Sequence, residues 1–159
     1  MEYNIDFAER LIDAADSFFE KADVGNEAAR AVLYLSLLSC EISLKAVLES
    51  AGYTTKQLTA RSHNINGLIT EICRCEIPGS QLGGFVSAAK LLSISPIHAV
   101  PGATVGKILD AESEGASKYP NEIRYGDLIT HYDAAHVLKC AKSVAEWSKA
   151  NMGSIRRRQ

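Results

Sequence analysis

Hydrophobic residues recur every three or four positions along several stretches of the chain, the spacing that places them on one face of an α-helix. The clearest such stretch covers residues 5–22. A second runs from about residue 27 to 50, with Asn26 as its expected N-cap and Gly52 as its expected stop. On a helical wheel this second segment is apolar nearly all round, which predicts a helix at the centre of a bundle.

The remaining helices are predicted from shorter patterns. Ser62 is expected to cap a third helix ending near residue 72, and Ser80 to start a fourth that reaches Leu92 despite Gly83 and Gly84. Residues 93–120 are rich in proline and glycine and predict a long connection with a short helix around 104–112. The last helix is expected to begin between residues 125 and 133 and to end near 150.

No segment shows the strict alternation of a strand bounded by turns, so the predicted fold class is all-α. We expect an up-and-down bundle of about five helices that forms one domain over residues 1–151. Residues 152–159 have little to bury, which predicts a disordered basic tail that includes Arg156, Arg157 and Arg158.

Composition narrows the class of protein without naming a function. The 159 residues are 47% hydrophobic and 23% charged, with a net charge of −2, values close to the average for globular domains. This balance argues against a protein whose whole surface binds nucleic acid non-specifically, but it leaves room for a local basic site. No signal peptide is visible, and the most apolar segment carries Glu41 and Lys45, so we expect a cytoplasmic protein with no membrane contact.

Cysteine and acidic residues give no metal signature. The four cysteines suit reduced core residues, and Cys73-x-Cys75 lacks the spacing and the second pair of a zinc site. We therefore expect no metal and no cofactor.

Two polar groups stand out inside the helical patterns. Glu41 and Lys45 are one turn apart with apolar flanks, and a partly buried carboxylate there needs a cationic partner, for which Arg124 or His63 is a candidate. His63 follows Ser62 at a predicted helix start, where capping and packing are favoured over catalysis. For both groups a structural role is the favoured interpretation.

Three segments together resemble the HEPN superfamily (higher eukaryotes and prokaryotes nucleotide-binding). They are ARAVLYLSLLSCEISLKAVLESAGY, SHNINGLI and YPNEIRYGD, in that order and ahead of a terminal helix. The similarity covers about residues 5–150 and matches poorly over 93–118. It implies an up-and-down helical bundle, often dimeric, in a prokaryotic defence or toxin–antitoxin setting.

Many members of that superfamily are metal-independent ribonucleases whose site is an arginine followed by a histidine. Arg124 and His131 have a matching six residues between them. If both lay on one helix they would share a face but stand roughly 10 Å apart along the axis. The resemblance implies His131 as the base for a ribose 2′-hydroxyl and Arg124 as the phosphate clamp, giving a 2′,3′-cyclic phosphate.

The residues after Arg124 favour a different branch of the resemblance. Tyr125-Gly126 is more similar to members associated with nucleotidyltransferases, in which the bundle binds and does not cut. That branch implies binding of a nucleotide, of RNA or of a partner nucleotidyltransferase. The residues implied in nucleotide or phosphate binding are Arg124, Tyr125, Tyr119, Lys45, Glu41 and His63. The ribonuclease and a helical scaffold remain as alternatives, so the sequence leaves open whether the protein is an enzyme.

A homodimer is the expected assembly. The second helix is apolar on more than one face, and the last helix carries an apolar row of Val137, Ala141 and Val144 together with Trp147. A closed twofold interface would cover such surfaces and would place two Arg124–His131 pairs across one cleft.

Overall fold

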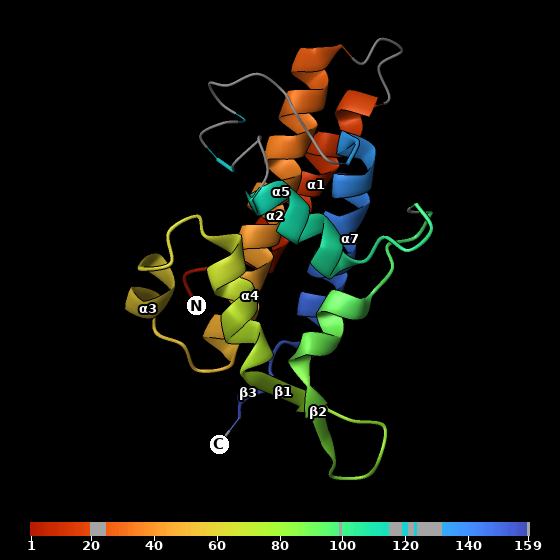
Figure 1. The fold of residues 1–159 in the computed structure, drawn as a ribbon. Coiled ribbons are helices and arrows are strands. Elements are labelled where there is room, and N and C mark those ends of the chain that lie inside the picture. Colours follow the sequence, from red (N-terminus) through yellow and green to blue (C-terminus); the bar gives the residue numbers. More distant parts are fainter. Residues whose placement is uncertain (20–24, 99, 115–118, 121–122, 124–131, 159) are drawn as a thin grey trace.

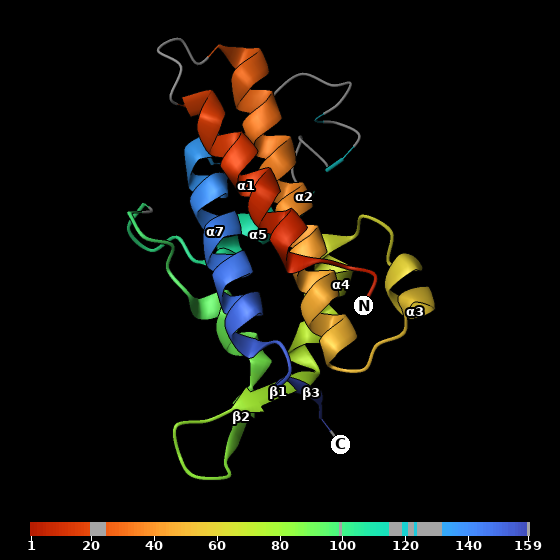
Figure 2. The ribbon, with the colours of Figure 1, turned by 180° about the vertical axis from the view of Figure 1, so that it is seen from behind.

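A core of long helices dominates the computed structural model, which describes residues 1–19, 25–98, 100–114, 119–120, 123 and 132–158. Helices α1 (Ile5–Phe19), α2 (Asn26–Ser50) and α7 (Ala134–Asn151) lie side by side (Figures 1 and 2). The mostly helical fold predicted from the hydrophobic periodicity is therefore confirmed.

Helix α2 is the centre of the core, as its all-round apolar wheel predicts. It packs against α1 and α7, with α4 (Ile65–Cys73) also in contact. Ser39, one of its small residues, donates from its hydroxyl to the backbone carbonyl of Ala8 on α1 at 2.9 Å. By length and composition α2 could also cross a membrane, but 72% of its most apolar window is buried inside the protein, as in the central helix of a bundle.

The remaining helical elements cover the side of α2 and α7 that faces away from α1 (Figures 1 and 2). They are α4, the 3₁₀ helix η1 (Ala88–Ser93) and α5 (Val105–Glu114). Helix α5 confirms the short helix expected near residues 104–112. A further short helix, α3 (Thr55–Thr59), lies in a stretch expected to be loop. Thr54 and Gln57 close a capping box around its first turn.

Three strands contradict the prediction of a chain without them. β1 (Cys75–Pro78) pairs antiparallel with β2 (Phe85–Ser87) on one edge and with β3 (Arg156–Arg157) on the other. The fourth helix expected from Ser80 to Leu92 is accordingly wrong, because a turn, β2 and η1 occupy that stretch. Gly83, at φ +74°, takes a left-handed conformation in the turn that a helix interior does not allow.

The predicted helix caps need smaller corrections. Gly25, not Asn26, is the N-cap of α2, and Asn64, not Ser62, caps α4 by accepting a 2.8 Å bond from the amide of Gly67. The predicted stop at Gly52 is confirmed, since this residue follows the α2 C-cap with φ +89°.

The predicted disordered tail is wrong over its described residues. Ile155 is 4% exposed within the core cluster, and Cys75 of β1 lies opposite Arg157 of β3. The amide of Arg158 donates to the carbonyl of Arg74 at 2.9 Å. One buried isoleucine and pairing to a distant strand hold a segment whose own sequence looks fully solvated.

Candidate functional site

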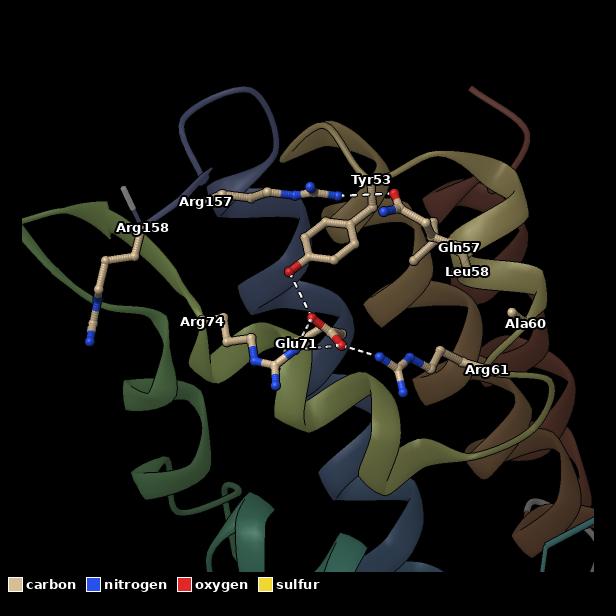
Figure 3. A pocket seen from close by; sticks show the side chains of 9 residues that line it. All are labelled: Tyr53, Gln57, Leu58, Ala60, Arg61, Glu71, Arg74, Arg157 and Arg158. Carbon is tan, nitrogen blue, oxygen red and sulfur yellow. Dashed lines mark hydrogen bonds and ion pairs between the residues drawn. The ribbon is translucent and has the colours of Figure 1, made fainter.

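An arginine-rich cavity of about 530 Å³ lies where β3 meets α3 and α4. Figure 3 shows its lining, in which four arginine side chains accompany a single carboxylate. The cavity is lined by Tyr53, Gln57, Leu58, Ala60, Arg61, Glu71, Arg74, Arg157 and Arg158. We call this set the arginine cavity.

Glu71 forms the acidic centre of the arginine cavity. It is 4% exposed, and its carboxylate accepts from Arg61, from Arg74 at 3.2 Å and from the Tyr53 hydroxyl at 2.9 Å. Burial alone would raise the pKa of Glu71, but the Tyr53 hydrogen bond and the charges of Arg74 and Arg61 outweigh it and lower that pKa. Glu71 is therefore ionised at neutral pH and holds two guanidinium groups in place.

The C-terminal strand supplies the other two arginines. The Arg157 guanidinium lies 3.7 Å from the centroid of the Tyr53 ring, and its Nη2 donates to Gln57 Oε1 at 3.0 Å. Arg158 also lines the arginine cavity, and its guanidinium bonds to no side chain in the part of the chain that the structure describes. The cavity wall therefore carries one guanidinium stacked on an aromatic ring, that of Arg157, and one without a bonded side chain among the described residues, that of Arg158.

Each paired guanidinium keeps donors for a ligand. Arg61 reaches Glu71 through Nη2, Arg74 reaches it through Nη1, and Arg157 reaches Gln57 through Nη2. An arginine carries five N–H donors in a planar fork. The side chains are thus oriented by the protein while most of their N–H groups remain available to an anion.

Local structure explains why these residues meet. Arg61 follows α3 in a tight turn, and Glu71 and Arg74 stand three residues apart at the end of α4, where they share a helix face. Only the antiparallel pairing of β3 with β1 brings in Arg157 and Arg158, from about 85 residues further along the chain than Arg74. No local pattern signals that pairing, which is why the sequence did not indicate the cavity.

A second polar cluster surrounds Glu41 on α2 and joins four residues expected in nucleotide or phosphate binding. Glu41 is 4% exposed and accepts from Lys45 Nζ at 2.7 Å, from the Tyr119 hydroxyl at 2.6 Å and from His63 Nδ1 at 2.9 Å. His63, one of the two candidate partners, is thus confirmed as a partner of the Glu41 carboxylate. The cluster satisfies the carboxylate with three donors from three segments.

Hydrogen bonding decides the ionisation of Glu41. Burial by itself would raise its pKa, but hydrogen bonds from Lys45, Tyr119 and His63 outweigh that effect and lower the pKa. Burial and the same contact raise the pKa of Tyr119, so its hydroxyl remains the donor at neutral pH. Lys45 is itself 5% exposed, so the Glu41–Lys45 pair is buried inside the protein and not presented to solvent.

Changing Tyr119 to phenylalanine should lower the free energy of unfolding by about 1.5–3 kcal/mol, the range for hydrogen bonds to charged groups. The ring and its packing against Tyr34 remain, so the loss reports on the hydroxyl bond to Glu41. Urea unfolding would measure it. Tyr132→Phe is the matched control, because the Tyr132 hydroxyl bonds to none of the described residues, and equal losses in both variants would contradict the role given to Tyr119.

Arg124, Tyr125 and His131 lie outside the described residues, so their expected meeting stays a prediction. The nearest described residues on either side are Ile123 and Tyr132. Ile123 is 1% exposed, and the amide of Tyr132 donates to Oε1 of the fully buried Glu112 at 2.8 Å. These two residues therefore contact the helical core.

Among the described residues no group of three histidine, cysteine or acidic side chains could hold a metal ion. Comparison with known proteins found no matching family model, curated protein or solved structure. The site must therefore be interpreted from its own chemistry.

Proposed function

We propose that the protein binds the phosphate groups of a nucleotide or of RNA in the arginine cavity. The observation that carries this proposal is the presence of four arginines around one concave site. Arginine forks match phosphate geometry with paired N–H donors, and several of them together offset the repulsion between neighbouring phosphate oxygens.

The contrast between local and total charge supports the proposal. The whole chain carries a net charge of −2, whereas the cavity gathers four guanidinium groups against the single carboxylate of Glu71. A protein with no ligand for these groups would gain little from placing like charges together, because they repel one another. Three of the four guanidinium groups, on Arg61, Arg74 and Arg157, are already oriented by protein partners, so a ligand loses less binding energy to ordering them.

Calorimetric titration of ADP and of adenosine into the purified protein tests the proposal. ADP should bind, and adenosine should bind at least about a hundredfold more weakly, because two or more charge-assisted contacts are missing. The ADP affinity should fall as salt concentration rises. Equal binding of both ligands, or no ADP binding at millimolar concentration, would refute a phosphate site.

Metal-independent RNA cleavage is a second candidate, which rests on the spacing of Arg124 and His131 in the sequence. Both residues lie outside the described ranges, and the described residues on either side contact the core: Ile123 is buried, and the Tyr132 amide donates to Glu112. Purified protein should then cleave RNA in the presence of a chelator, and His131→Ala should abolish cleavage with thermal stability nearly unchanged. Cleavage that needs a divalent metal would remove this mechanism.

Membership of the HEPN superfamily, a homodimer, a nucleotidyltransferase partner and a cytoplasmic location remain proposals that rest on the sequence. A mostly helical core with α2 at its centre is compatible with the first of them. Light scattering at micromolar concentration tests the second, since a dimer would have twice the 17.2 kDa mass of the chain.

A further inference from the structure

A second arginine–aromatic stack stands beside the arginine cavity. The guanidinium carbon of Arg156 lies 3.4 Å from the centroid of the Phe85 ring, and Arg156 Nε donates to Glu76 Oε1 at 2.7 Å. The hydrogen bond and the ring together fix the guanidinium plane. The Arg156 side chain is nevertheless 56% exposed, so the stack remains accessible from solvent.

The two stacks lie on opposite sides of one short strand. Arg156 and Arg157 are successive residues of β3, and successive side chains of a strand point to opposite faces of the sheet. Arg156 stacks on Phe85 of β2, and Arg157 stacks on Tyr53 in the arginine cavity. β3 is one of the two edge strands of the sheet, so a flexible ligand can pass around it.

We infer that a single-stranded nucleic acid binds across β3, with phosphates in the arginine cavity and one base stacked on the Arg156–Phe85 pair. This inference rests on the phosphate-binding function proposed above and names the class of ligand. A base can stack on a guanidinium plane as it does on an aromatic ring, whatever its identity. Bases inside a duplex are already stacked on both faces, so a duplex offers a free base face only at its two ends.

A free mononucleotide fits this pair of stacks less well than a strand does. It can hold its phosphate in the arginine cavity and its base near the Arg157–Tyr53 stack of the same cavity, but it cannot also reach the Arg156–Phe85 stack on the other face of β3. A strand of several nucleotides can do so, with its negative backbone following Arg156, Arg157 and Arg158. This run of cations on a weakly acidic chain fits an electrostatic track for a single strand.

Fluorescence anisotropy with labelled decamers of single-stranded RNA and of single-stranded DNA tests the inference, with UMP as competitor. A decamer should bind at least about tenfold more tightly than UMP because it gains one more stacked base. The same RNA annealed into a blunt duplex should bind more weakly than the single strand. Comparing the RNA decamer with the DNA decamer shows which of the two nucleic acids the protein prefers.

Variants at the Phe85 stack give the sharper test. Phe85→Leu keeps an apolar side chain without a ring, and Arg156→Lys keeps the charge without a plane. Each should weaken decamer binding about tenfold while leaving UMP affinity unchanged. Leu82→Ala is the matched control in the same hairpin, because Leu82 is fully exposed.

Failure of this inference differs from failure of the proposed function. If UMP and ADP bind but the decamer gains nothing, or if Phe85→Leu and Leu82→Ala bind it equally, the strand across β3 is refuted and the phosphate site stands. Equal binding of duplex and single strand also refutes the strand. If no phosphate ligand binds, both proposals fail.

Discussion

Replacing Glu41 with alanine should remove about 3–5 kcal/mol from the free energy of unfolding, the cost of breaking a buried ion pair from one side. The side chains of Glu41 and Lys45 are 5% and 6% exposed, so the Lys45 ammonium would be left buried without its counter-charge. His63 and Tyr119 would lose the same acceptor. Urea unfolding at neutral pH measures the loss.

Two controls separate charge from packing. A double replacement, Glu41→Leu with Lys45→Met, should recover much of the stability, because apolar residues of similar volume often replace a buried pair without loss. Glu27→Ala removes an exposed partner of Arg30 and should cost below about 1 kcal/mol. A loss below about 0.5 kcal/mol in Glu41→Ala would mean that the pair behaves as a surface pair.

The pH dependence of this effect follows from the lowered pKa of Glu41. Its pKa in the folded protein lies below the ordinary value of 4.5, so ionised Glu41 stabilises the fold fully at pH values above 4.5. That contribution is lost as pH falls from 4.5 through the folded pKa. The difference in unfolding free energy between the protein and Glu41→Gln should therefore shrink below pH 4.5.

Arg158→Ala should weaken ADP binding by roughly 10- to 100-fold, the equivalent of one charge-assisted hydrogen bond. Its guanidinium bonds to no side chain in the described ranges, so the unfolding midpoint should not change. Calorimetric titration and thermal unfolding together measure the two effects. Arg10→Ala is the control, since Arg10 is a surface arginine 3.9 Å from Asp13 and distant in sequence from every cavity residue.

The opposite change in cavity charge should have the opposite effect. Glu71→Gln removes the negative charge of the only carboxylate among the cavity-lining residues but keeps an amide oxygen that can accept from Arg61 and Arg74, so ADP should bind more tightly. If Arg158→Ala binds ADP as well as the unchanged protein does, Arg158 is not part of the site. Weaker binding in Glu71→Gln would mean that Glu71 must hold its arginines for binding to occur.

The helical part of the fold could be predicted because its signal is local. The period of apolar residues in α1 and α2 and the glycine after α2 are readable within a few turns. The strands could not be predicted in the same way, because β1, β2 and β3 are 4, 3 and 2 residues long. Strands that short carry no alternation, and the pairing of β3 with β1 depends on contacts across most of the chain.

The Glu41 cluster and the arginine cavity also differ in whether the sequence carries a local signal for them. Glu41 and Lys45 stood out as charges inside an apolar helix, and the need of a buried carboxylate for a cation pointed to Arg124 or His63, of which His63 bonds to it. The arginine cavity had no such signal. Arg157 and Arg158 have the composition of a solvated tail, and only the burial of Ile155 and the pairing of β3 place them beside Arg61 and Arg74.

Nuclear magnetic resonance of the arginine side-chain Nε–H groups during an ADP titration would show which arginines bind phosphate. The signals can be assigned from single arginine-to-lysine variants. If the arginine cavity is the phosphate site, ADP should shift the signals of its four arginines, Arg61, Arg74, Arg157 and Arg158, with one common affinity, while those of Arg10 and Arg30 stay in place. ADP binding that shifts other arginines and leaves these four unchanged would show that the arginine cavity is not the phosphate site.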